Sequence, residues 1–153
     1  MPPFVQRVLD HWDRQDVPYL PGVTAEEMHR VERELGVELP NEFRAFYLAT
    51  NGTGVPGTEG TDRDFVKFWR LQDCDRTGWR LTFIDYMYYM AYYAVDLGGG
   101  DGYGRGSVYL LHGDIHLVAK SFDEFTELYV RDDTRLAPDG SEAYHRRVLA
   151  GEE

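Results

Sequence analysis

The sequence is poor in cysteine and in long apolar stretches, and both features bear on where the protein works. Cys74 is the only cysteine, so no disulfide can form within the chain, and a reducing compartment fits this best. No stretch approaches the roughly 18 apolar residues of a membrane-spanning helix. Residues 1–20 alternate apolar with charged side chains and lack the unbroken apolar centre of a signal peptide. We therefore expect a cytoplasmic protein that does not insert into membranes.

Basic residues are also scarce. Lys and Arg number 16 against 27 Asp and Glu, which gives a net charge of −11. Proteins that bind DNA or RNA neutralise phosphates with positive charge, so direct nucleic-acid binding is disfavoured, as is an anionic membrane surface. A basic protein partner is favoured because opposite charges speed encounter. An acidic surface can also serve only to keep a protein dispersed, so charge alone leaves both interpretations open.

Patterns typical of phosphate or metal sites are missing. The glycine-rich segment 98–102 lacks the G-x-G-x-x-G spacing and leads into a predicted strand, whereas a phosphate-binding loop leads into a helix. His112 and His116 have the spacing that binds zinc on a helix, but Gly113-Asp114 predicts a hairpin turn between them. With His112 opposite Ile115, the two imidazoles are expected on opposite faces of the strands. We therefore expect neither a metal nor a cofactor.

Catalytic constellations are missing as well. Cys74 lies between Asp73 and Asp75, whose charges would raise the pKa of the thiol and disfavour the nucleophilic thiolate. There is no Gly-x-Ser-x-Gly motif. Acidic pairs such as Asp132-Asp133 are interpreted as solvated surface residues. The sequence thus predicts no catalytic residues, and we expect that the protein is not an enzyme.

The residues that are present predict one domain over residues 1–153. Hydrophobic residues make up 42% of the chain and aromatic residues 14%, enough to bury a core without disulfide or metal support. Helical spacing and capping boxes predict helices over 3–15, from Thr24 to Gly36, from Pro40 to Asn51, from Ser121 and over 141–150. Short aromatic or alternating segments predict antiparallel strands at 65–71, 80–86, 87–97, 107–112 and 115–119. Helices, then strands, then helices indicate an α+β fold.

Several motifs occur in the order found in one known superfamily. They are Glu32 with Leu35-Gly36, Leu39-Pro40 before Phe43, Asn51-Gly52, Phe68-Trp69 with Leu71, Phe83 to Met87, Val108-Tyr109, and Ala119 to Phe122 leading to Phe125. Over residues 24–132 this arrangement resembles the SUKH superfamily (the Smi/Knr-like domain), with the helices at 3–15 and 141–150 as flanks. The resemblance implies a curved, mainly antiparallel sheet with helices packed against it. It also implies protein binding, because bacterial members are commonly immunity proteins that neutralise a toxin and fungal relatives are cell-wall regulators.

We therefore expect a non-enzymatic protein-binding domain, with a bacterial immunity protein that neutralises a cognate basic toxin as the leading hypothesis. An intracellular scaffold or regulator with no toxin partner is the alternative, and a small-ligand or enzymatic role in the concave face of the sheet is a third hypothesis. Tyrosine occurs 11 times, and tyrosines mixed with acids are typical of a surface that binds a basic protein. The tyrosines from Tyr88 to Tyr93 fit equally well as a strand packed beneath helices, since alternate side chains face opposite sides. We place the partner contacts on two loops, at Glu59, Asp62, Asp64, Asp101 and Tyr103.

Overall fold

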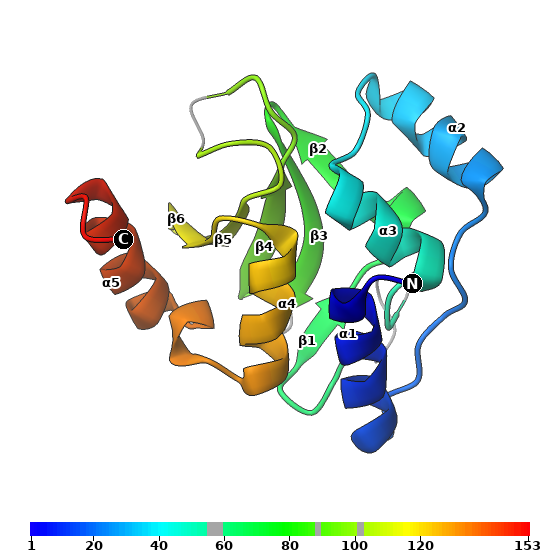
Figure 1. Cartoon of the computed structure of the whole chain (residues 1–153), viewed down its shortest axis with the longest axis horizontal. Coiled ribbons are helices and arrows are strands. Elements are labelled where there is room, and N and C mark those ends of the chain that lie inside the picture. The colour runs from blue at the N-terminus through cyan, green and yellow to red at the C-terminus, as the bar shows by residue number, and fades with distance from the viewer. Residues whose placement is uncertain (55–59, 88–89, 101–102) are drawn as a thin grey trace.

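The computed structural model describes residues 1–54, 60–87, 90–100 and 103–153 (Figure 1). In chain order its elements are α1 (Pro3–Arg14), α2 (Ala25–Leu35), α3 (Asn41–Ala49), β1 (Val66–Phe68), η1 (Leu71–Asp73), β2 (Asp75–Thr77), β3 (Arg80–Tyr86), β4 (Ala91–Asp96), β5 (Val108–His112), β6 (Asp114–Ala119), α4 (Phe122–Arg131), η2 (Thr134–Leu136) and α5 (Pro138–Leu149). The elements η1 and η2 are short 3-10 helices. The order of helices and strands is the α+β arrangement that the sequence predicts.

The strands form one open antiparallel sheet in the order β1-β3-β4-β5-β6. Strand β1 pairs with the end of β3, where Val66 lies opposite Tyr86, and β2 pairs with the start of β3, where Thr77 lies opposite Arg80. Both short strands therefore lie along the same edge of β3. The segment before β1 consequently reaches the end of the sheet at which β3 turns into β4.

Helices α1, α3 and α4 pack together over one face of the sheet, while α2 packs on α3 and α5 lies against β6 (Figure 1). Their apolar sides meet in a core rich in aromatic rings. The Phe122 ring lies 5.4 Å from that of Phe46 and 5.7 Å from that of Phe83, and the Trp12 ring lies 5.1 Å from that of Phe68. A smaller cluster around Tyr109, Leu117 and Tyr144 joins α5 to the sheet.

The predicted helix ends are confirmed by their capping contacts. The Thr24 hydroxyl accepts a hydrogen bond from the Glu27 amide at 3.1 Å, and the Ser121 hydroxyl accepts one from the Glu124 amide at 3.1 Å. Gly36 ends α2 with a left-handed backbone, φ 75°. Capping depends on residues close together in sequence, so these boundaries could be located without the fold.

The strands follow the prediction less closely. Strand β3 has the predicted bounds, but β1 is shorter than the predicted 65–71 and β2 was not predicted. The predicted strand 87–97 begins only at Ala91, because Met87 has a left-handed backbone (φ 52°) that ends the extended run. Tyr88 and Tyr89, part of that prediction, lie outside the described residues.

The predicted register of the β5–β6 hairpin was wrong. Leu111 lies opposite Ile115 and His112 opposite Asp114, which leaves Gly113 alone at the turn with φ 74°. Because directly opposite residues share a face, this register puts His112 and His116 on the same face of the hairpin, contrary to the prediction.

Candidate partner-binding site

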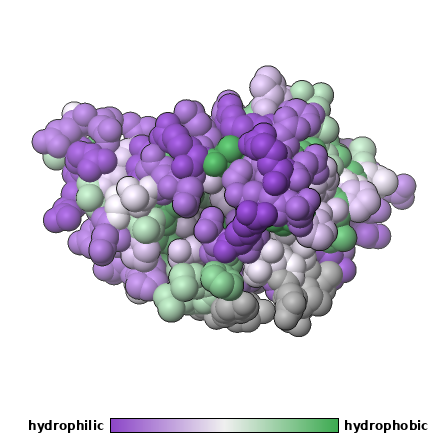
Figure 2. Space-filling view, turned by 90° about the horizontal axis from the view of Figure 1, so that it is seen from below, coloured by the Kyte–Doolittle hydropathy of each residue, from purple (hydrophilic) through white to green (hydrophobic). Residues whose placement is uncertain are grey.

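A cavity of about 300 Å³ opens where the start of β1, the end of β3 and the α4–η2 connection meet. Its walls are formed by acidic and tyrosine side chains with a few apolar or small neighbours: Asp64, Val66, Tyr86, Tyr93, Tyr129, Asp132, Asp133, Thr134, Leu136 and Ala137. We call this cavity the acidic tyrosine pocket. Figure 2 views the molecule from this end; most of the face is hydrophilic, and hydrophobic side chains appear in separate patches near the centre, at the right side and at the lower edge.

The tyrosine walls are held by hydrogen bonds from beneath. Tyr93 on β4 donates its hydroxyl proton to the Leu136 carbonyl oxygen at 2.6 Å. Tyr129 on α4 donates to Oδ2 of Asp62 at 2.5 Å and accepts from Nε1 of Trp12 at 2.8 Å. Burial raises the pKa of both phenols, so they stay neutral. Because these hydroxyl protons are already donated, these two tyrosines offer the pocket ring surface and oxygen lone pairs.

Three carboxylates bring negative charge to the pocket. Asp133 accepts from the Arg135 amide and from Nη2 of Arg131, both at 2.8 Å, and these donors hold the pKa of its carboxyl below the usual value. The pKa of Asp64 is shifted in the opposite direction from that of Asp133. Partial burial and the nearby charges of Asp132 and Asp62 raise the pKa of its carboxyl. Asp132 ends α4, where the helix dipole adds negative partial charge.

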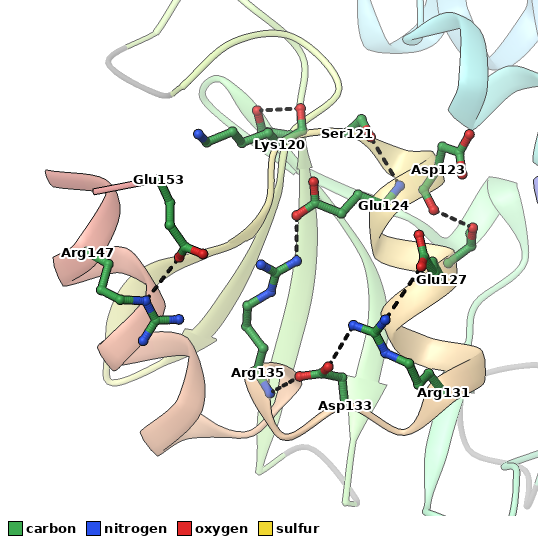
Figure 3. Close-up of polar contacts among 12 residues, drawn as sticks. Lys120, Ser121, Asp123, Glu124, Glu127, Arg131, Asp133, Arg135, Arg147 and Glu153 are labelled. Carbon is green, nitrogen blue, oxygen red and sulfur yellow. Dashed lines mark hydrogen bonds and ion pairs between the residues drawn. The ribbon is translucent and has the colours of Figure 1, made fainter. Parts of the chain in front are cut away.

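The arginines beside the pocket are already paired with acids (Figure 3). Arg131 contacts Glu127 at 3.5 Å as well as Asp133, and Arg135 contacts Glu124 at 2.5 Å while its guanidinium lies 4.0 Å from the centre of the Tyr144 ring. In contrast, Asp64 and Asp132 are exposed and form no ion pair with any other described residue. Both acids interact electrostatically with His11, whose pKa burial lowers. The pocket thus presents two carboxylates that form no ion pair with a described lysine or arginine.

Apolar side chains stand next to the pocket. Phe65 is 43% exposed, Met87 37% and Met90 60%, and the Met87 amide donates to the Phe65 carbonyl at 2.9 Å. Phe65 and Met87 have positive φ, 63° and 52°, as does Asp132 at 52°. Non-glycine residues rarely adopt this conformation, and such strain concentrates at functional sites. We call Phe65, Met87 and Met90 the apolar rim.

The structure separates the predicted contact residues. Glu59 and Asp101 lie outside the described residues. Asp64 lines the pocket, whereas Tyr103, 43% exposed, follows the opposite end of β4, where its ring lies 5.6 Å from that of His145. Asp64 and Tyr103 therefore lie beyond opposite ends of β4, so these two described residues do not combine into one small patch.

Asp62, also predicted as a contact, is only 6% exposed. Its Oδ1 accepts from the amides of Asp64 and Val66 at 2.8 and 2.9 Å, and its Oδ2 accepts from Tyr129. In this structure the carboxylate holds the 62–66 loop against α4. Of the two predicted acids, Asp62 is therefore a structural group in the loop, and Asp64 is the one exposed to solvent.

Tyr86, Tyr129 and Asp132 were missed by the sequence reasoning. The only signal for Asp132 was the Asp132-Asp133 pair directly after a predicted helix, which had been interpreted as solvated surface. Their local sequence does not distinguish Tyr86 and Tyr129 from core aromatic residues. Each tyrosine both lines the pocket and packs in or against the hydrophobic core.

Two histidines make stability depend on pH. Burial, with a smaller effect of Arg14, lowers the pKa of His11, whose ring lies 5.5 Å from that of Tyr129. Burial, with a smaller effect of His116, lowers the pKa of His145. The unfolded chain therefore binds protons that the folded chain does not as the pH falls through the usual histidine range near 6.5.

We expect the free energy of unfolding to fall as the pH is lowered from 8 to 5.5, measured by urea titration at each pH. Replacing either His11 or His145 by glutamine should flatten that dependence, because a glutamine takes up no proton. A pH profile unchanged by both substitutions would contradict the assignment.

Other chemistry finds little support in the described part of the chain. No group of three or more His, Cys, Asp or Glu side chains there is placed to hold a metal ion. Burial is the main cause that raises the pKa of the Cys74 thiol, beyond the neighbouring acids considered from the sequence. Among residues 1–54, 60–87, 90–100 and 103–153, no helix combines the length and apolar character needed to cross a bilayer.

An open antiparallel sheet with helices packed over one face defines an α+β domain. The chain belongs to the SMI1 / KNR4 family (SUKH-1), whose model matches residues 22–128. This confirms the resemblance found from the motifs. No curated protein sequence matches the chain. Membership in this family supports an immunity-type or Smi/Knr-like domain. Members of the family are generally known as immunity or regulatory domains.

Proposed function

We propose that this protein is a cytoplasmic immunity protein that binds and neutralises a basic toxin domain, without catalysing a reaction. The observation that carries the proposal is the acidic tyrosine pocket, where Asp64 and Asp132 have no cationic partner among the described residues. Family membership and the net charge of −11 support the same conclusion.

Binding would proceed in two stages: electrostatic attraction brings the two proteins together, and this protein then covers the basic surface of the toxin. A charge of −11 steers a basic protein toward this one. Toxins that act on nucleic acid need a basic surface for the phosphates, and an acidic partner with a similar charge pattern competes for that surface. Tyrosines and exposed methionine or phenylalanine are the side chains that interfaces favour. These side chains would supply contact area after electrostatic attraction has brought the two proteins together.

The test is protection from a defined toxin. We expect co-expression of this chain to restore the growth of cells that express the toxic domain encoded beside its gene. In kinetic measurements with that purified domain, the double variant Asp64→Asn/Asp132→Asn should slow association about tenfold and weaken its salt dependence, because steering charge is lost.

The matched control is Glu34→Gln/Glu38→Gln, which removes two exposed charges at and just after the end of α2, outside the pocket lining. It should alter association much less, because only the pocket charges are close to the bound partner. Absence of growth protection, or protection with no physical complex, would refute the immunity function and favour the regulatory alternative.

A further inference from the structure

We infer that the acidic tyrosine pocket binds the guanidinium group of a single arginine side chain supplied by a protein partner. The inference deepens the proposed function, on which it rests for the existence of a basic protein partner. It assigns the pocket a ligand of defined chemistry.

The size and lining of the pocket fit one side chain. A volume of about 300 Å³ lies at the lower end of the range for small-ligand pockets, which starts near 300 Å³. The groups that face it are carboxylates and tyrosine rings, and two tyrosine hydroxyl protons are already donated to Leu136 and Asp62. A cation is therefore the complementary ligand. An anion would meet Asp64 and Asp132 and would be repelled.

A guanidinium fits this lining better than an ammonium. The Tyr86 and Tyr93 rings stand edge to face, 6.4 Å apart, and offer aromatic surface on which a planar cation can stack. Asp64 and Asp132 line the cavity from different parts of the chain. Asp64 lies just before β1, and Asp132 follows the last residue of α4. A guanidinium carries five N–H donors in a flat fork and can reach both carboxylates, whereas an ammonium concentrates its charge at one point.

The apolar rim indicates that the arginine belongs to a protein. All three side chains of the rim are exposed. Phe65 and Met87 neighbour lining residues in sequence, and the Met90 amide donates to the Met87 carbonyl. A free amine or amino acid would leave this surface in water. A folded partner that inserts an arginine would cover it, and anchor residues such as arginine are typically surrounded by contacts that exclude water.

The experiment uses the full chain and three small probes. N-acetyl-arginine amide is titrated against the ¹⁵N-labelled protein, beside N-acetyl-lysine amide and N-acetyl-citrulline amide, which has nearly the shape of the arginine probe without its charge. We expect arginine to bind in the millimolar range, with amide shifts concentrated at Val66, Tyr129 and Asp133. Lysine should bind several-fold more weakly and citrulline at least tenfold more weakly, because a guanidinium combines charge and planarity.

The double variant Asp64→Asn/Asp132→Asn should reduce arginine binding at least tenfold, while Glu34→Gln/Glu38→Gln should leave it within twofold. Since all four positions are exposed, both variants are expected to fold, and the wild-type shift map provides a result that needs no variant. Citrulline or lysine binding as tightly as arginine, or shifts that map elsewhere, would overturn the inference. Arginine binding without protection from the toxin would refute the proposed function alone, and protection without arginine binding would refute this inference alone.

Discussion

Replacing Asp62 by alanine is expected to lower the free energy of unfolding by about 3 kcal/mol, since buried and part-buried donors lose the carboxylate that accepts from them. The carboxylate accepts from the amides of Asp64 and Val66 and from the Tyr129 hydroxyl, and it is only 6% exposed. Alanine would leave three donors without these partners inside the protein. Urea titration followed by circular dichroism measures the loss.

Asp64→Ala is the matched control, because it removes the same atoms two residues away at an exposed position. Its effect should stay within about 0.5 kcal/mol, with a tendency to stabilise, since burial and neighbouring acids disfavour the charged form of Asp64. If Asp62→Ala were as mild as Asp64→Ala, Asp62 would not hold the loop. The prediction from the sequence that Asp62 contacts the partner would then be favoured again.

The contrast between these two acids shows where sequence reasoning ends. Asp62 and Asp64 lie in the same short segment, and both were predicted to face a partner. The fold separates them because Tyr129, far away in sequence, brings its hydroxyl to Asp62. A contact between α4 and the segment before β1 leaves no mark on local composition or spacing.

Local features could be predicted well. Thr24, Gly36 and Ser121 mark helix ends through contacts with residues three or four positions away. The predicted start of β4 was wrong. A run of aromatic residues favours a strand, but it does not show where the backbone turns. Met87 adopts a conformation that its residue type disfavours, so only tertiary structure could place the turn there.

The candidate site could be predicted only in character. Net charge and abundant tyrosine indicated an acidic, aromatic surface for a basic partner. Its position could not be predicted, because the pocket joins Asp64, Tyr86, Tyr93, Tyr129 and Asp132 from four separate parts of the chain. The pairing of Val66 with Tyr86 and the packing of α4 on the sheet bring those parts together.

The motif residues of the family, by contrast, are expected to act through stability. Phe122 begins α4, is fully buried, and lies within 6.2 Å of five other rings, those of Phe4, Phe43, Phe46, Phe83 and Phe125. Phe122→Ala removes most of a ring from the centre of the core. The surrounding aromatic residues are large and come from several elements, so they can fill the resulting cavity only in part. A loss of about 3–5 kcal/mol is expected in the free energy of unfolding.

Phe65→Ala deletes the same atoms from the apolar rim, where the ring is 43% exposed, and should cost less than about 1 kcal/mol. The two variants should separate in opposite ways by urea titration and by toxin binding. Phe122→Ala should lose stability yet bind normally under conditions in which it remains folded, while Phe65→Ala should keep its stability and bind more weakly. Equal stability losses would contradict the central position of Phe122. Weak binding by folded Phe122→Ala would mean that the core motif, and not only the pocket surface, determines recognition of the partner.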